Sequence, residues 1–212
     1  MSDIINILLV GVGGQGTILA GKVLARAAVL WGRDVKFSEI HGMAQRGGSV
    51  VTQVRLGAQV PSPVIDPGTA DFLLSFEQLE ALRWAPMVRP GGLVLMSTQI
   101  IEPAPVLLGQ AQYPTDIMEQ LRARGPLVAV DAPALGAAAG NARTGNVGLL
   151  GCLARHLPLP RALWQQALDE VVPERHRAVN QRAFATGWET QPQGAQPPSA
   201  EPAAAPPTAE EA

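Results

Sequence analysis

The spacing of hydrophobic residues changes near the start of the chain. Residues 4–10 form a short run that is almost entirely aliphatic and ends at a glycine, which is typical of a strand buried on both faces of a parallel sheet. From Thr17 to Trp31 the apolar residues recur at helical spacing, and Gly32 follows where such a helix would end. The pattern therefore predicts a strand, a glycine-rich turn and a helix in direct succession.

The same alternation continues along the chain and predicts the remaining elements. Further strands are expected at residues 35–40, 49–56, 70–76, 92–96 and 127–130, the second of these half exposed. Helices are expected at 77–84, from an N-cap at Thr115 through Arg122, and at 145–156, 160–171 and 174–185. Such alternation predicts an α/β fold: a single Rossmann-like domain with a mostly parallel sheet flanked by helices and a helical C-terminal part.

The composition changes at the C-terminal end of the chain. From about Thr190 the residues are mostly Pro, Ala, Gln and Glu, with almost no large apolar side chain. Such a segment buries too little apolar surface to offset the entropy lost on ordering. We therefore expect a folded domain at residues 1–188 and a disordered Pro/Ala-rich tail at 189–212.

The overall composition removes several function classes. The 212 residues carry a formal charge of −2, which provides no strong field for nucleic acid or an anionic membrane. A single cysteine, Cys152, cannot supply the ligands of an iron–sulfur cluster, and the three histidines lack metal-ligand spacing. The N-terminal segment has no basic region and no long apolar run. We expect a cytoplasmic protein that binds no metal, no nucleic acid and no membrane.

The first candidate site is the glycine turn after the first strand. Its glycines have the G-x-G-x-x-G spacing, between an expected strand and an expected helix. Such turns allow close approach of a ligand, and the free N–H groups at the helix start favour an anion. The candidate residues are Gly11, Gly13, Gly14, Gln15, Gly16 and Thr17. Two interpretations remain open: a phosphate-bearing ligand binds here, or the glycines serve only the close crossing from strand to helix.

The second candidate site is the loop after the second strand, which concentrates polar groups and glycines at a strand's carboxyl end. Ligands bind at that edge of open α/β sheets. Its candidate residues are Ser38, Glu39, His41, Gly42, Met43, Gln45, Arg46, Gly47, Gly48 and Ser49. Arg46 beside two glycines can form an anion site that Ser49 can join. A solvated loop with Arg46 paired to Glu39 is the alternative.

No residue is a certain catalytic group on the sequence alone. His41 is a weak candidate for general acid or base chemistry, because a single histidine is more often a structural hydrogen-bonding residue. Glu39 has roughly the position of the acidic residue that binds ribose hydroxyls in dinucleotide enzymes. NAD or FAD binding therefore remains open at this point.

Taken together, residues 11–20 and 38–49 resemble the gamma-type subunit or domain of the 2-oxoacid:ferredoxin oxidoreductases, and among them the beta subunit of the indolepyruvate type. The resemblance extends over about residues 3–187, and Asp131 and residues 146–151 also resemble the family's later pattern. The second segment is much more specific than the first. The resemblance implies that residues 1–188 are similar to domain III of pyruvate:ferredoxin oxidoreductase.

The resemblance also implies partners and cofactors. The family's enzymes decarboxylate a 2-oxoacid oxidatively and pass electrons to ferredoxin and the acyl group to coenzyme A. Thiamine diphosphate with magnesium and the 4Fe-4S clusters would lie on a large partner subunit, and coenzyme A would be shared. This chain would then bind no cofactor by itself and be inactive alone. Arg46 would contact a phosphate, and His41 and Gln45 would line the interface or the acyl-transfer region.

Two other function classes compete with this one. A free-standing NAD- or FAD-dependent oxidoreductase would use Glu39 on the ribose and would bind nucleotide without a partner. A nucleotidyl-transferring enzyme of the ubiquitin-activating kind also has a G-x-G-G-x-G turn, but the lone Cys152 argues against it. The substrate among 2-oxoacids, the stoichiometry and the role of the tail are not determined by the sequence.

Overall fold

The computed structural model describes residues 4–42 and 47–190, and its centre is a six-stranded sheet. The strands lie in the order β2-β3-β1-β4-β5-β6. Their bounds are β1 Ile5–Val12, β2 Asp34–His41, β3 Ser49–Gly57, β4 Ala70–Ser75, β5 Val88–Ser97 and β6 Leu127–Val130. Since β3 is antiparallel to both β1 and β2 and the other pairs are parallel, β3 alone runs against the rest. The predicted mostly parallel sheet is confirmed.

The position of β3 differs from the simplest expectation. After the crossover from β1 to β2 the chain turns back, and β3 pairs with both strands along their whole length. The prediction of a half-exposed strand was wrong, because this insertion gives β3 a neighbouring strand on each side, while α1 packs on one of its faces and the segment around Ile65 on the other. Its polar residues are accommodated inside: Thr52 is fully buried, and Gln53 Oε1 accepts a hydrogen bond of 2.7 Å from Ile65 N.

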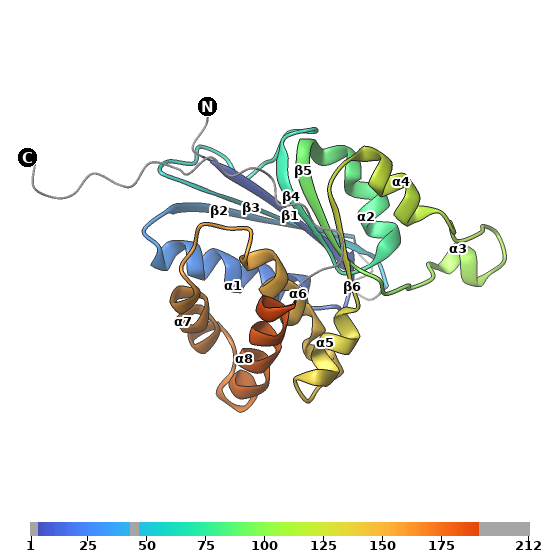
Figure 1. Cartoon of the computed structure of the whole chain (residues 1–212). Coiled ribbons are helices and arrows are strands. Elements are labelled where there is room, and N and C mark those ends of the chain that lie inside the picture. The colour runs from blue at the N-terminus through green and yellow to red at the C-terminus, as the bar shows by residue number, and fades with distance from the viewer. Residues whose placement is uncertain (1–3, 43–46, 191–212) are drawn as a thin grey trace, which may run out of the picture.

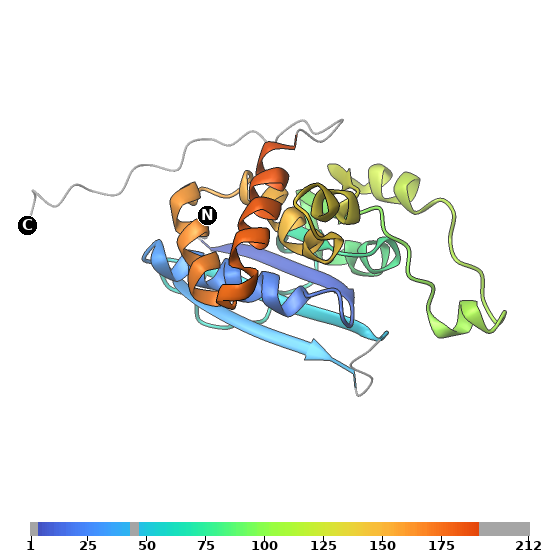
Figure 2. The ribbon, with the colours of Figure 1, turned by 90° about the horizontal axis from the view of Figure 1, so that it is seen from below.

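Helices cover both faces of the sheet (Figure 1). One layer contains α1 Thr17–Leu30, α5 Ala132–Ala138, α6 Gly145–Ala154, α7 Arg161–Val171 and α8 Glu174–Glu189. The other contains α2 Gln78–Trp84 and α4 Ile117–Arg124, and short helical segments occur at η1 Ala85–Met87, α3 Ala104–Leu107 and η2 Ala142–Thr144. Figure 2 shows β2 along the outer edge of the sheet and α3 projecting from the body.

Two apolar clusters arise from the alternation of side chains along the strands. Ile7 and Leu9 of β1 face the layer with α1 and α6, whereas Leu8 and Val10 face α2 and α4. All four are fully buried, which confirms that β1 is covered on both faces. The sheet therefore presents only its edges and strand ends to the surroundings.

The helices α6 and α8 pack through glycines. A Cβ atom built on Gly187 would lie 1.8 Å from the carbonyl oxygen of Gly148, and one on Gly151 would lie 2.3 Å from the carbonyl oxygen of Phe184. No side chain fits into either space. Trp164 of α7 stacks on Phe184 with ring centroids 5.7 Å apart, which completes this apolar layer.

Several helix boundaries differ from those predicted. A helix not predicted from the sequence, α5, follows β6 directly: Asp131 Oδ1 accepts from Ala134 N at 2.9 Å and caps it. The predicted N-cap Thr115 was wrong by one residue, since Asp116 occupies that position and α4 extends to Arg124. Helix α8 continues to Glu189, because Gly187 and Trp188 pack on the C-terminal layer.

Within residues 4–42 and 47–190, no helix is both long enough and apolar enough to cross a bilayer. The expected disorder of the C-terminal segment stays a prediction, since 191–212 lie outside the described residues.

Candidate functional site

The two loops singled out in the sequence meet at the carboxyl edge of the sheet. Gly13 N donates to the carbonyl oxygen of Gly48 at 2.8 Å, and Gly47 N approaches the carbonyl oxygen of Gly13 at 3.5 Å. This contact follows from the pairing of β1 with β3, because the end of β1 lies opposite the start of β3. The glycine turn and the second loop therefore form one surface.

Gly16 is the glycine of the turn whose role is clearest. It has φ +82°, a left-handed conformation that side chains disfavour, and it forms the N-cap of α1. A Cβ there would lie 2.2 Å from the amide nitrogen of Asn146 on α6. Asn146 Nδ2 itself donates to the carbonyl oxygen of Gly16 at 3.3 Å. The lack of a side chain at Gly16 thus allows α6 to approach the turn.

The side-chain amide of Gln15 makes three hydrogen bonds within the protein. Its Oε1 accepts from Val12 N at 2.8 Å, while its Nε2 donates to the carbonyl oxygen of Phe76 at 2.8 Å and to Gln99 Oε1 at 3.0 Å. These bonds join the ends of β1, β4 and β5. The amide of Gln15 therefore fixes the turn, and its place among the candidate ligand-binding residues stays a prediction.

A first pocket lies between the glycine turn and the second strand. It encloses about 320 Å³ and is lined by Gly13, Gly14, Gly16, Thr17, Ile18, His41 and Val50. The first residues of α1 form one wall, and no side chain caps this helix start. His41, at the end of β2, forms the opposite wall, and its Nδ1 lies 3.2 Å from the carbonyl oxygen of Gly42. Residues from both predicted sites therefore share this pocket.

A second pocket of about 380 Å³ lies on the other side of Gly14. Besides Gly14, its lining residues are Gln15, Phe76, Gln99, Ala132, Pro133, Ala142, Arg143, Gly145 and Asn146. At this pocket the chain leaves two neighbouring strands toward opposite faces of the sheet. Helix α1, which follows β1, lies on one face, and α2, which follows β4, lies on the other. Such a switch point is where ligands bind in open α/β sheets. Exposed Arg143 makes this pocket suitable for an anion.

Glu39 does not lie next to the glycine turn. In dinucleotide-binding folds the second strand neighbours the first, whereas here β3 separates them, so that β2 lies two strand spacings, roughly 10 Å, from β1. Glu39 is exposed and pairs in register with Thr52. The inserted strand therefore removes the geometric basis for a ribose contact by Glu39.

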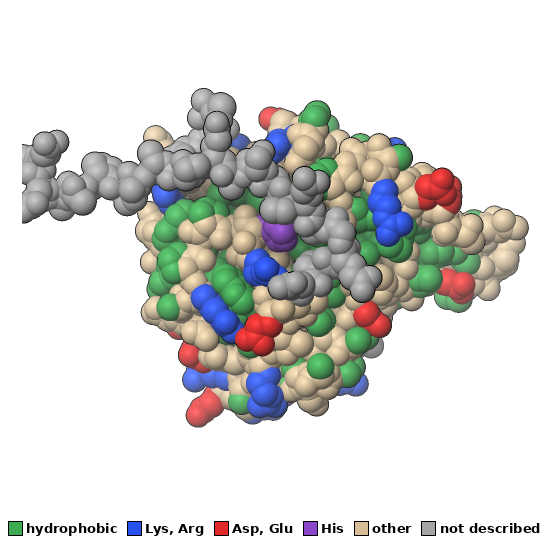
Figure 3. All heavy atoms as spheres, in the orientation of Figure 1, with side chains coloured by type: hydrophobic (Ala, Val, Ile, Leu, Met, Phe, Trp, Pro, Cys, Tyr) green, Lys and Arg blue, Asp and Glu red, His purple; other side chains and the backbone are tan. Residues whose placement is uncertain are grey.

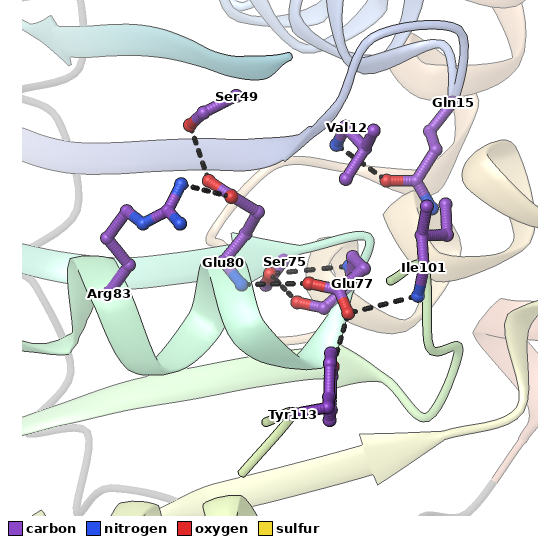
Figure 4. Close-up of polar contacts among 9 residues, drawn as sticks. All are labelled: Val12, Gln15, Ser49, Ser75, Glu77, Glu80, Arg83, Ile101 and Tyr113. Atoms are coloured by element: carbon purple, nitrogen blue, oxygen red, sulfur yellow. Dashed lines mark hydrogen bonds and ion pairs between the residues drawn. The ribbon is translucent and has the colours of Figure 1, made fainter. Parts of the chain in front are cut away.

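Two buried carboxylates on α2 organise the loops from the opposite face of the sheet (Figure 4). Glu80 Oε2 accepts from Ser49 Oγ at 2.5 Å, and its Oε1 pairs with Arg83 Nη1 at 2.6 Å. The hydroxyl of Ser49 therefore points to α2 rather than to the glycine turn. Neighbouring residues of a strand face opposite sides, and it is Val50 that lines the pocket at the glycine turn. Sequence reasoning assigned Ser49 to an anion site; the structure engages it with a carboxylate.

Glu77 is the second of these carboxylates and is only 1% exposed. It caps α2 by accepting from Glu80 N at 2.9 Å, and it also accepts from Ile101 N at 3.3 Å and from Tyr113 Oη at 2.5 Å. Burial, followed by this hydrogen bond, raises the pKa of the Tyr113 phenol. The phenol therefore remains a donor to Glu77 well above the pH at which a free tyrosine ionises.

Sequence reasoning missed the residues outside the two motifs. Glu77 and Glu80 have the spacing of a capping box, which is a usable signal. Gln99, Tyr113 and Arg143 have no local signal, because only the tertiary fold brings them to the site. Among the predicted residues, Ser38 lies within β2 and pairs in register with Gln53. Met43, Gln45 and Arg46 lie outside the described residues.

Comparisons with known proteins show the family of this chain. The model of the pyruvate ferredoxin/flavodoxin oxidoreductase family matches residues 6–190. The chain belongs to this family. It is 40% identical over 188 residues to the indolepyruvate oxidoreductase subunit IorB of Thermococcus kodakarensis, an alignment covering 86% of this chain and 93% of the relative. The resemblance stated from residues 11–20 and 38–49 is therefore confirmed.

Two solved structures share the fold. One is the gamma subunit of a keto/oxoacid ferredoxin oxidoreductase from Geobacter sulfurreducens, with a TM-score of 0.66 and 23% identity over 88% of this chain and 95% of that one. The other is the 2-oxoglutarate:ferredoxin oxidoreductase from Magnetococcus marinus, with a TM-score of 0.68 and 18% identity. It was solved with 2-oxoglutarate, coenzyme A and succinyl-CoA bound, and the match covers 89% of this chain and 31% of that chain. At these identities the likeness concerns the fold alone.

The residues of this chain do not fit the redox cofactors of such enzymes. Cys152 is buried in α6, its Sγ donates to the carbonyl oxygen of Gly187 at 3.2 Å, and burial raises the pKa of its thiol to about 12. A cluster needs several thiolates at one point. In the part of the chain that the structure describes, no group of three or more His, Cys, Asp or Glu residues is arranged to hold a metal ion.

Proposed function

We propose that this chain is the small subunit of a 2-oxoacid:ferredoxin oxidoreductase of the indolepyruvate or arylpyruvate type. The observation that carries the proposal is the 40% identity to an indolepyruvate oxidoreductase subunit along 93% of that subunit's length. Thiamine diphosphate with magnesium and the 4Fe-4S clusters would lie on the large partner subunit, since a lone buried cysteine cannot ligate a cluster. Ferredoxin would accept the electrons, and the chain alone would be inactive.

The role we assign to this chain is to present the carboxyl edge of its sheet to the large subunit and to coenzyme A. The pockets on either side of Gly14 support this role, because both open between loops that internal hydrogen bonds hold in place. Arg143 in the second pocket and Arg46 in the second loop are the cations we propose for the phosphates of coenzyme A. His41 would line the acyl-transfer region rather than act as a base.

The function is tested by reconstitution with the large subunit of an indolepyruvate:ferredoxin oxidoreductase from the same organism. We expect indolepyruvate-dependent reduction of methyl viologen by the pair, with phenylpyruvate accepted and with pyruvate and 2-oxoglutarate used poorly. Neither subunit alone should show this activity. A preference for pyruvate or 2-oxoglutarate would overturn the arylpyruvate assignment, and activity of the isolated chain would overturn the subunit role.

The same assay tests the coenzyme A assignment. Replacing either cation, in Arg143→Ala or Arg46→Ala, should raise the apparent KM for coenzyme A by roughly tenfold and leave the KM for the 2-oxoacid unchanged, because a charge-assisted hydrogen bond to phosphate is lost. Arg124→Ala is the matched control, since this exposed arginine lines a pocket at the opposite, amino edge of the sheet. An unchanged KM for coenzyme A in both variants would remove these residues from the site.

The competing function is a free-standing NAD- or FAD-dependent oxidoreductase. Titration calorimetry of the isolated chain with NAD and FAD distinguishes it, because a dinucleotide enzyme binds its nucleotide without a partner. We expect no heat of binding for either nucleotide, since β3 separates β2 from the glycine turn. Binding at micromolar concentration, abolished by Glu39→Ala, would favour the alternative.

A further inference from the structure

An arm formed by residues 100–112 projects from the body of the molecule. It follows β5 and carries the short helix α3, and it extends away from the sheet in both ribbon views (Figure 1, Figure 2). Leu107 and Leu108 at its tip are 69% and 70% exposed, and Ile100 at its base is 55% exposed. Exposed apolar residues gathered on one projecting element are typical of an interaction site.

The arm has almost no charge. Glu102 is the only ionisable residue in 100–112, and no lysine or arginine occurs there. The front face of the body, by contrast, carries basic and acidic side chains among its hydrophobic ones (Figure 3). A segment of this composition gains little from electrostatic contact with a partner and loses little polar hydration when it is covered. Its surface therefore fits an apolar, uncharged groove.

The tip of the arm is preorganised by its own backbone. Pro103 begins a turn in which Leu107 N donates to the carbonyl oxygen of Pro103 at 3.2 Å and Leu108 N to that of Ala104 at 2.9 Å. Gln110 N donates to the carbonyl oxygen of Pro105 at 2.8 Å. Since two prolines also restrict the chain, little conformational entropy remains to be lost when a partner binds the two leucines.

The neck of the arm is tied to the candidate site. Glu77 holds both ends, accepting from Ile101 N where the arm begins and from Tyr113 Oη where it ends. Immediately before the arm, Gln99 accepts from Gln15 of the glycine turn. A protein that covers the glycine turn therefore meets the arm on the same edge of the sheet.

We infer that the arm docks into an apolar groove of the large subunit. This inference rests on the proposed subunit function. A second copy of this chain is a poorer occupant, because the exposed large hydrophobics of the described body away from the carboxyl edge occur singly: Val29 is on α1, and Val64 is in the segment between β3 and β4. The arm acts as an anchor that orients the candidate site toward the partner.

The test is the affinity of the purified large subunit for full-length variants of this chain, measured by biolayer interferometry. Leu107→Ser/Leu108→Ser should weaken binding by roughly tenfold to a hundredfold without lowering the thermal midpoint of the isolated chain, since both side chains are exposed. Val29→Ser/Val64→Ser is the matched control, with two valines 49% and 55% exposed outside the arm. It should bind like the wild type.

The outcomes separate the arm from the subunit assignment. If the wild-type chain binds the large subunit and the arm variant binds equally well, the arm inference is overturned and the proposed function stands. If the wild-type chain does not bind the large subunit at all, the proposed function fails and the arm inference with it. If the isolated wild-type chain is a dimer by light scattering and the arm variant is a monomer, the occupant is a second copy and the inference is wrong.

Discussion

The C-terminal helical layer and the carboxyl edge of the sheet pack differently: helices meet backbone to backbone in the layer, whereas polar side chains connect the loops at the edge. In the layer, α6 and α8 touch backbone to backbone at Gly148 and Gly187, with aromatic rings around them. At the edge, side-chain amides and carboxylates such as Gln15 and Glu77 bridge the loops and leave pockets between them. The layer therefore buries apolar surface, whereas the edge keeps the open pockets at which we propose that partners and ligands bind.

The largest effect is expected from filling the contact between the two helices. Gly187→Ala places a methyl group 1.8 Å from the carbonyl oxygen of Gly148, so α8 must move. An exposed helical glycine would gain stability on the same change, but here we expect a loss of about 3 kcal/mol or more in the free energy of unfolding, the upper end of the cost of overpacking. Urea unfolding followed by circular dichroism measures it.

The matched control for this change is Gly42→Ala, where a Cβ meets nothing within 4 Å. Its free energy of unfolding should change by less than about 0.5 kcal/mol. If Gly187→Ala were as stable as this control, the backbone contact between α6 and α8 would be absent in solution.

The next effect concerns the edge. Gln15→Ala removes the acceptor of Val12 N and the donor to Phe76 and Gln99. We expect a loss of about 1–3 kcal/mol in the free energy of unfolding, and a complex with lower activity, because partly buried backbone groups lose their partners. Gln110→Ala on the exposed arm is the control, and it should leave stability unchanged. A Gln15→Ala variant with full stability would show that water replaces the amide.

A smaller effect is expected at the neck of the arm. Tyr113→Phe keeps the ring but removes the hydroxyl that donates to Glu77. The free energy of unfolding should fall by about 1 kcal/mol, and amide hydrogen exchange should become faster at Ile101. Exchange within β1 should not change, which serves as an internal control. Unaltered exchange at Ile101 would mean that Glu77 does not restrain the arm.

The smallest effect is a pH dependence that belongs to the helical layer. Burial, followed by the charge of Arg155, lowers the pKa of His156 below its usual value. Between the lowered pKa of the folded state and the ordinary value of about 6.5, the unfolded chain therefore binds more protons than the folded chain. The free energy of unfolding falls as the pH drops below about 6.5, because His156 is protonated more readily in the unfolded chain. From pH 7 to 5 we expect His156→Gln to lose less stability than the wild type, by under about 1 kcal/mol. Equal losses in urea unfolding would contradict this.

The two regions also differ in how far they could be predicted. The glycine turn could be predicted from the spacing of its glycines, and helix α6 from its apolar residues, because both signals are local. Nothing local distinguishes Gly187, which lies two residues beyond the helix predicted at 174–185 and comes close to Gly148 only because α8 packs on α6. Likewise, Tyr113 and Gln99 reach the site only because β5 and α4 bring them to the same edge.

By itself, the sequence determined the order of the six strands and of the longer helices, though not α5, as well as the glycine turn at the end of β1, the lack of a cysteine set for a cluster, and the family resemblance of residues 38–49. These properties depend on local periodicity and composition. Only the tertiary structure decided that β3 lies between β1 and β2, which separates Glu39 from the turn and joins Gly13 to Gly48. Strand order is set by contacts between distant residues, and hydrophobic periodicity carries no record of which strands become neighbours.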